Sequence, residues 1–343
     1  MGSDDQQGLA IDDPPSVGSA VRGGVGLADA ESPESPEAPE SPWGPAHQVT
    51  DVHQHLWPEA LVEALRARTD FPRMRGWTLE TGREPAFVAN PADHDPVTRR
   101  AADRAAGVDG AVLSLSAPIG VEWLDPEEGF PLLDAWHRGA LALGHGHSVW
   151  AAASVSEPEP AGLMAALDLG CVGLQIPANA VSTPRALDRL APLLEVCQSR
   201  DVPVLVHPGP ADVSPHLPGW WAPVVEYTTQ MVSAWWSWHL EGRRLLPSLR
   251  ICFAAGAGLA PIHHERLSAR GGVLGAIDPG VFVDTSSYGP QALDALVRVL
   301  GIDSLVFGSD RPYAEPTDPA SGSAATRAIR CANPRRLLKG GAA

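Results

Sequence analysis

Eight short apolar runs recur along the chain, and segments with helical spacing separate them. The runs lie at 49–54, 110–116, 148–155, 172–176, 202–207, 249–254, 281–285 and 304–309. Each run is continuously apolar rather than alternating with polar residues, which is typical of parallel strands buried on both faces. Eight such units in roughly 290 residues predict a (β/α)8 TIM barrel. A doubly wound open sheet is the alternative, but no glycine-rich phosphate turn opens any of the helical segments.

Two segments fall outside this alternation. Residues 1–46 are rich in Gly, Ser, Pro and acidic residues, with little apolar surface to offset their ordering entropy. We expect a disordered tail over 1–46 and a barrel domain over 47–343. Residues 70–95, after the first strand, are punctuated by Pro and Gly and are too long for a tight connection. They predict a small inserted hairpin or lid.

Composition narrows the class of protein further. The formal net charge of −16 argues against nucleic-acid and anionic-membrane partners. No apolar run approaches the roughly eighteen residues of a membrane span, and the first residues do not resemble a secretory signal. Four widely spaced cysteines without a C-x-x-C pair suit reduced core residues. These features predict a cytoplasmic protein that acts on a small molecule.

Two histidines stand one residue apart at the end of the first predicted strand. Because side chains alternate along a strand, His53 and His55 project from the same face, and Gln54 faces the other way. Their imidazoles then reach one point, as two ligands of a metal ion do. The alternative is that both histidines are exposed loop residues. Further candidate ligands at the ends of other strands would favour the metal site.

Such ligands follow two other predicted strands. His207 comes directly after the fifth apolar run, and Asp310 follows the eighth. A core histidine bonded to a carbonyl group, and an aspartate that forms a turn, are the structural alternatives. In a barrel, however, the carboxyl ends of all strands meet at one face, where the active site lies. Three imidazoles and one carboxylate there suit Zn²⁺, or Fe²⁺ or Mn²⁺, with an open coordination position.

These segments resemble those of a known family. Residues 51–55, 206–208 and 307–310 are similar to the metal-site segments of the amidohydrolase superfamily. The resemblance is to the amidohydrolase-related branch that contains aminocarboxymuconate-semialdehyde decarboxylase, and residues 106–116, 284–289 and 333–338 extend it over about 48–338. It implies that His53, His55, His207 and Asp310 bind one divalent metal ion. Asp310, next to both the metal and its bound water, is then the residue best placed to move protons.

The chain departs from that family at two places. Binuclear members carry a bridging lysine on strand four, where this chain has Gln175, so the resemblance implies a mononuclear site. The family also places an acid/base histidine after strand six, where residues 253–258 contain none. His263, a few residues later, is the catalytic candidate that replaces it, and a surface position on the following helix is its alternative.

Three residues are candidates for substrate binding. Arg311 suits a bidentate bond to a substrate carboxylate, or a structural bond at the barrel rim. Trp220 and Trp221 suit an aromatic wall over the site. Trp235, Trp236 and Trp238 in the same excursion instead suit a helix face packed on a neighbouring subunit, which leaves a homodimer open.

The function expected from these features is hydrolysis of a small organic substrate through a metal-activated water. Decarboxylation of an aromatic or unsaturated carboxylate on the same site is the alternative. A barrel that binds a metal or ligand with little catalysis, because the strand-six histidine is absent, is the second alternative.

Overall fold

All eight predicted strands form, and together they make one parallel sheet in the computed structural model of the chain. The structure describes residues 48–144, 146–316 and 322–340, so the predicted tail lies outside the described residues. The strands follow one another around the sheet in chain order. They are β1 (Thr50–Gln54), β5 (Gly110–Leu113), β6 (His147–Ala152), β7 (Gly173–Pro177), β8 (Val204–His207), β9 (Ile251–Phe253), β10 (Val281–Asp284) and β11 (Leu305–Val306).

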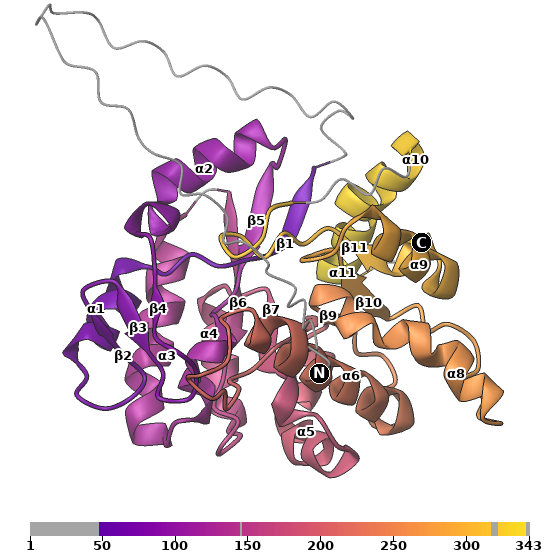
Figure 1. Cartoon of the computed structure of the whole chain (residues 1–343), viewed down its shortest axis with the longest axis horizontal. Coiled ribbons are helices and arrows are strands. Elements are labelled where there is room, and N and C mark those ends of the chain that lie inside the picture. The colour runs from indigo at the N-terminus through magenta and orange to yellow at the C-terminus, as the bar shows by residue number, and fades with distance from the viewer. Residues whose placement is uncertain (1–47, 145, 317–321, 341–343) are drawn as a thin grey trace, which may run out of the picture. The chain divides into compact units, whose positions relative to one another are not determined.

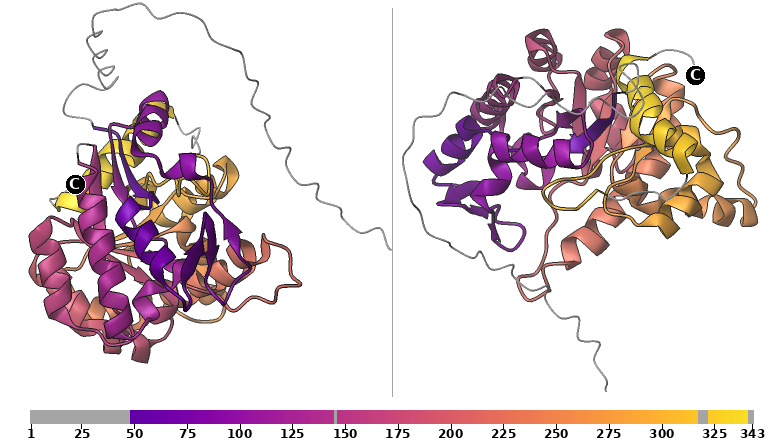
Figure 2. Two further views of the ribbon diagram at one scale, coloured as in Figure 1. Left: turned by 90° about the vertical axis from the view of Figure 1, so that its left-hand side faces the viewer. Right: turned by 90° about the horizontal axis from the view of Figure 1, so that it is seen from above.

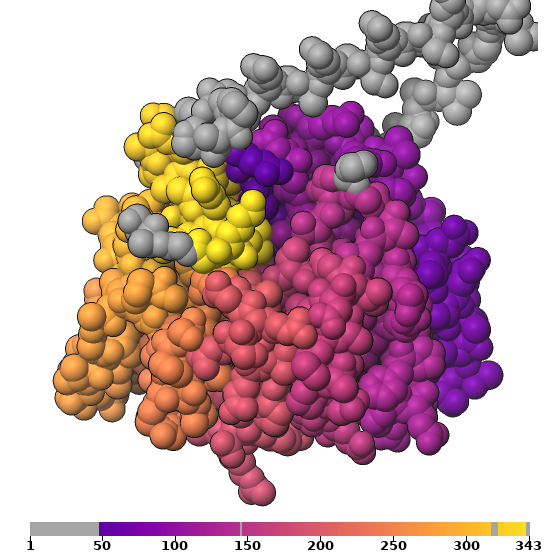
Figure 3. Space-filling model, turned by 180° about the vertical axis from the view of Figure 1, so that it is seen from behind, coloured from indigo at the N-terminus to yellow at the C-terminus, as the bar shows by residue number. Residues whose placement is uncertain are grey.

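The sheet closes between its first and last strands. The backbone N–H of Val52 donates to the carbonyl oxygen of Phe307 at 2.9 Å, and a parallel bridge joins Gln54 to Arg311. Helices surround the strands (Figure 1), and the space-filling view from behind shows the surface changing colour in chain order, from indigo on the right to orange on the left (Figure 3). The (β/α)8 barrel is therefore confirmed.

The helices start where the sequence carries start signals. Each of α2, α3, α4, α5 and α9 begins at a proline, whose fixed φ suits the first helical position. Helix α3 begins at Pro126, where two glutamates in the first turn also favour a helix start. The main helices are α1 (Glu59–Ala67), α2 (Pro96–Ala105), α3 (Pro126–Ala142), α4 (Pro160–Leu169), α5 (Pro184–Ser199), α6 (Tyr227–Ser237), α8 (His263–Ala269), α9 (Pro290–Leu300), α10 (Gly322–Arg327) and α11 (Asn333–Lys339).

The barrel interior is tightly filled below the carboxyl ends of the strands. The indole of Trp150 on β6 is fully buried and donates to the carbonyl oxygen of Val52 across the barrel at 2.8 Å. A Cβ at Gly173 on β7 would lie 2.4 Å from this ring, so only glycine fits there. All four cysteines are buried, as expected.

The insertion after β1 is a small antiparallel sheet of β2 (Arg73–Arg75), β3 (Thr78–Glu80) and β4 (Phe87–Val88), as predicted. It meets the loop that follows β8, since the backbone N–H of Val213 donates to the carbonyl oxygen of Arg83 at 2.9 Å. Figure 2 shows the indigo insertion and this loop on the same side of the barrel.

Three tryptophans lie in α6 and at the start of the helical turn that follows it. Trp235 and Trp238 are buried in the protein's own core, and Trp236 packs against that core. The long excursion after β8 thus folds back onto the barrel, and a subunit contact on this face stays a prediction. None of the described helices is both long enough and apolar enough to span a membrane.

Candidate metal centre

The four predicted ligands meet at the carboxyl ends of the strands. One atom from each of His53, His55, His207 and Asp310 lies within 4.8 Å of the other three. The Nε2 atoms of His53 and His55 are 3.0 Å apart, and Asp310 Oδ1 lies 3.1 Å from His55 Nε2. The three imidazoles are buried and nearly perpendicular to one another. Three nitrogens and one oxygen converging in this way suit one divalent metal ion.

Each imidazole is oriented by a hydrogen bond from its far nitrogen. Nδ1 of His53 lies 2.7 Å from Asp284 Oδ2, Nδ1 of His55 lies 2.9 Å from the carbonyl oxygen of Ser114, and Nδ1 of His207 lies 2.8 Å from that of Pro208. Because carbonyl and carboxylate oxygens only accept, each Nδ1 carries the proton. In the neutral form of each ring, Nε2 then presents a lone pair to the common point, which is the tautomer that a metal ion requires.

Backbone geometry places the aspartate. Asp310 has a φ of 62°, in the left-handed region that aspartate tolerates better than most residues. Its N–H donates to the carbonyl oxygen of His53 at 2.9 Å, which ties the end of β11 to β1. The side chain is 19% exposed, whereas those of His53 and His55 are at most 1% exposed, so the cluster opens towards solvent on the Asp310 side.

Burial controls the charges of these groups. Burial lowers the pKa of His55 and His207 well below the usual range, so both are neutral. Burial also lowers the pKa of His53, but the hydrogen bond and negative charge of Asp284 outweigh it and raise this pKa to about 9. Burial raises the pKa of Asp310. Asp284 is thus the neighbour that supplies negative charge to this set of donors.

Arg311 does not point into this site. Its Nη1 donates to Asp103 Oδ1 at 2.9 Å, and Asp103 also accepts from Gln54, whose side chain faces away from the two histidines. Arg99 completes this network through a hydrogen bond to Gln54 Oε1. Arg311 therefore forms the structural bond at the rim that was the alternative, and its bond to a substrate carboxylate stays a prediction.

The histidine proposed as a replacement lies on the surface. His263 is the first residue of α8 and is exposed, and the cluster of ligand atoms does not include it. Between it and β9, the chain makes a left-handed turn in which residues 255–259 all have φ between 46° and 61°. The glycines at 256 and 258 suit this turn. A catalytic role of His263 requires a movement of α8 and stays a prediction.

The mouth of the site has an aromatic residue that sequence reasoning missed. The ring of Tyr313 lies 5.3 Å from that of His55 and 5.8 Å from that of Phe87 on the inserted sheet, measured between centroids. Its hydroxyl lies 3.3 Å from Ser116 Oγ, which accepts from the indole N–H of Trp57 at 3.0 Å. The only signal in the sequence was its position three residues after Asp310.

A clasp joins the insertion to the loop after β8. Glu84 accepts hydrogen bonds from the hydroxyl of Tyr227 at 2.7 Å and from the backbone N–H of Ala211 at 3.0 Å. Trp221 packs with Tyr227 in a small apolar cluster and donates to Glu226, while Trp220 is 48% exposed beside it. Their contact with substrate stays a prediction.

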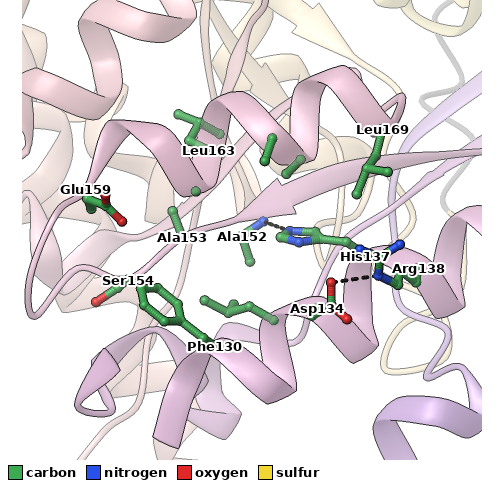
Figure 4. A pocket seen from close by; sticks show the side chains of 14 residues that line it. Phe130, Asp134, His137, Arg138, Ala152, Ala153, Ser154, Glu159, Leu163 and Leu169 are labelled. Atoms are coloured by element: carbon green, nitrogen blue, oxygen red, sulfur yellow. Dashed lines mark hydrogen bonds and ion pairs between the residues drawn. The ribbon is translucent and has the colours of Figure 1, made fainter. Parts of the chain in front are cut away.

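A cavity in the described part of the chain lies away from the ligand cluster. It has a volume of about 220 Å³ and lies between α3 and α4, outside β6 (Figure 4). His137 lines it and accepts the backbone N–H of Ala152 at 3.1 Å, as the dashed line in Figure 4 shows. Mostly apolar side chains such as Phe130 and Leu163 surround it. The chemistry of this cavity does not match that of the ligand cluster, so we place the functional centre at the cluster.

The fold and the four donors define a (β/α)8 barrel suited to one divalent metal ion at the carboxyl ends of its strands. The chain belongs to the amidohydrolase family, whose model matches residues 50–339.

Comparison with known proteins adds a curated relative. The chain is 29% identical over 161 residues to a 2-amino-3-carboxymuconate-6-semialdehyde decarboxylase of Dictyostelium discoideum. This match covers 43% of the chain and 45% of the relative, so it spans less than half of either protein.

Two solved structures share the fold at low identity. Metarhizium anisopliae IDCase has a TM-score of 0.68 at 18% identity, covering 85% of this chain and 97% of that one. A manganese-bound 5-carboxyvanillate decarboxylase from Novosphingobium aromaticivorans has a TM-score of 0.63 at 19% identity, covering 88% and 99%. These likenesses confirm the barrel.

Proposed function

We propose that the protein is a metal-dependent decarboxylase of an aromatic or unsaturated carboxylate. This was the alternative to hydrolysis in the sequence analysis. The observation that carries the proposal is the curated relative, which is a decarboxylase and belongs to the branch that the metal-site segments resemble. The structurally similar 5-carboxyvanillate decarboxylase acts, by its name, on an aromatic acid. Tyr313 beside His55 gives this chain an aromatic surface at the mouth of the site.

Each residue of the site has a separate proposed role. His53, His55, His207 and Asp310 would hold the metal ion, for which we propose Zn²⁺ or, as in the manganese-bound neighbour, Mn²⁺. The bound ion would supply positive charge that fixes an anionic substrate and stabilises charge developing on it. Asp284 keeps His53 in the required tautomer. The ring of Tyr313 packs against a planar substrate at the mouth.

Decarboxylation breaks the bond between the carboxylate and its carbon, and leaves the electron pair on that carbon. One proton must then bind the carbon for each CO2 released. Asp310 is the titratable ligand on the open side of the cluster, so it is the residue best placed to pass that proton.

A screen for CO2 release tests this function. Metal-loaded protein is incubated with hydroxybenzoates and unsaturated dicarboxylates, and CO2 and the decarboxylated product are quantified. We expect one carboxylate to turn over and Asp310→Asn to abolish turnover, because an amide neither accepts the proton nor binds the metal as well. His263→Ala, at an exposed position, should keep the rate within about 10-fold.

Two outcomes would contradict the proposal. Hydrolysis of an amide or lactone panel without CO2 release would restore the hydrolase expectation. Metal binding without turnover of either panel would favour the binding barrel. A loss of rate in His263→Ala as complete as that in Asp310→Asn would identify His263 as the acid/base residue.

A further inference from the structure

A second acidic side chain is buried on the β6 and β7 side of the barrel, outside the set of ligands. Glu122 belongs to the short helical turn Val121–Trp123 in the connection after β5, and its side chain is fully buried. The carbonyl oxygen of Glu122 accepts the backbone N–H of Val155, just after β6, at 2.8 Å. Its Oε1 accepts from Nε2 of Gln175 on β7 at 3.2 Å. The carboxyl group therefore reaches from the loop face towards β7.

The register of the sheet shows which side of β7 this contact occupies. Gln175 pairs with Leu205 on β8, and Pro177 pairs with His207. Paired residues of neighbouring parallel strands point to the same side of the sheet, and side chains two residues apart share a side. Since His207 points to the ligand cluster, Gln175 also points into the barrel, one level lower. Its partner on β6 is Ala152, whose side chain is only a methyl group.

Two oxygen atoms of this pair have no hydrogen-bond partner among the described residues. They are Oε2 of Glu122 and Oε1 of Gln175, and both are buried. Neither oxygen of an ionised carboxylate can donate, and neither can an amide oxygen, so an ionised Glu122 leaves both atoms unsatisfied. A proton on Oε2 supplies the missing donor, and the amide oxygen of Gln175 is the acceptor that needs it.

We propose that Glu122 is kept as a neutral carboxylic acid, paired with Gln175, and that it is the source of the proton that replaces CO2. The role as proton source rests on the proposed decarboxylase function. Asp310 does not start with a proton when it binds a metal ion, because a ligating carboxylate is deprotonated. A neutral carboxylic acid inside the same barrel does carry a proton before the reaction starts.

The electrostatics of Glu122 agree with this geometry. Burial raises the pKa of Glu122 to about 8, against hydrogen bonds from its own backbone N–H and from Gln175. The charged or titratable groups of the neighbouring elements α3 and β6 are Glu127, Glu128, Asp134, His137, Arg138 and His147. None of them contributes to this shift, and His137 faces Ala152 from outside the barrel.

The reaction balances with this proton. The bond between the ring or vinyl carbon and the carboxylate breaks, CO2 leaves, and the electron pair stays on the carbon. The O–H bond of Glu122 breaks, and its proton forms the new C–H bond on the substrate. Asp310 is able to pass this proton to the carbon. Solvent then returns one proton to the Glu122 carboxylate, so no oxidant, reductant or further reactant is required.

The first experiment needs no substrate. Infrared difference spectra of the full chain at pH 7 report the C=O stretch of protonated carboxyl groups. We expect Glu122→Gln to lose one such band, and Glu128→Gln, which changes an exposed glutamate, to lose none. If Glu122→Gln does not fold, Gln175→Leu should instead shift the band to higher frequency. Retention of the band unshifted in these variants would overturn the neutral acid.

The second experiment measures CO2 release against pH with a carboxylate found in the screen. We expect Glu122→Gln to lower kcat by ~10- to 100-fold with metal content and KM nearly unchanged, and to remove an alkaline limb near the pKa of Glu122. An unchanged kcat and an unchanged alkaline limb would overturn the role as proton source. Absence of CO2 release by the unaltered protein would instead refute the proposed function, and with it this role, while the infrared result would still decide the protonation state.

Discussion

The metal ligands were predictable from the sequence, but the role of Asp284 beside them was not. The four candidate ligands were predictable because each follows an apolar run that ends at the same face of a barrel. Asp284 lies at the end of the seventh run in the same way, but in the sequence it stands out only as part of the family resemblance. Its bond to His53 Nδ1 depends on how closely β10 approaches β1 inside the closed barrel, which sequence spacing does not specify.

Replacing Asp284 tests its role as the orienting partner. In Asp284→Asn, the amide has no negative charge to favour the required tautomer of His53, so we expect metal affinity to fall by about 10- to 100-fold. Titration with Zn²⁺ or Mn²⁺ at pH 7, read by calorimetry, measures this. Asp278→Asn makes the same chemical change at the partner of Arg243 and should leave the affinity unchanged. Equal affinities in both variants would contradict the role of Asp284.

Among the structural elements, the insertion was predictable from the sequence, whereas the turn after β9 was not. The inserted hairpin was predictable, because its Pro and Gly residues exclude a long helix. Its clasp to the loop after β8 was not, because Glu84 and Tyr227 are separated by 143 residues and meet only in the folded chain. The left-handed turn after β9 was also not predicted, since Ala255 and Leu259 are not residues that favour positive φ.

The clasp should matter for substrate binding and for stability. Tyr227→Phe removes the donor to Glu84, so we expect stability to fall by about 1 kcal/mol and KM for the carboxylate to rise more than kcat falls. Glu84→Gln serves as the second arm of a double-mutant cycle. Coupling between the two changes, read by thermal unfolding and KM, supports the clasp, whereas additive effects would show that the hydrogen bond contributes nothing.

The whole barrel depends on buried groups that sequence patterns do not reveal. Eight apolar runs predicted the architecture, but not which polar side chains it would enclose. His137 on α3 is one of these, because it is 7% exposed and accepts a backbone N–H of β6. Burial lowers the pKa of His137 to about 4. Its ordinary pKa near 6.5 applies in the unfolded chain.

This difference predicts loss of stability in acid. Between about pH 6.5 and 4 the unfolded chain binds a proton at His137 and the folded chain does not, so the free energy of unfolding falls as pH falls through this range. We expect melting temperatures measured over that range to fall less in His137→Gln than in the unaltered protein. The exposed His216→Gln is the matched control and should follow the unaltered protein. Parallel curves for all three would contradict the contribution of His137.

The central claim is that His53, His55, His207 and Asp310 form one divalent metal site, and the metal content of purified protein tests it most directly. Elemental analysis after loading with metal and removal of excess should give close to one ion per chain. His207→Ala leaves too few protein donors to hold the ion tightly, so it should retain almost none while keeping the barrel's circular dichroism spectrum. Two ions per chain, no ion under these conditions, or an unchanged content in His207→Ala would contradict the account.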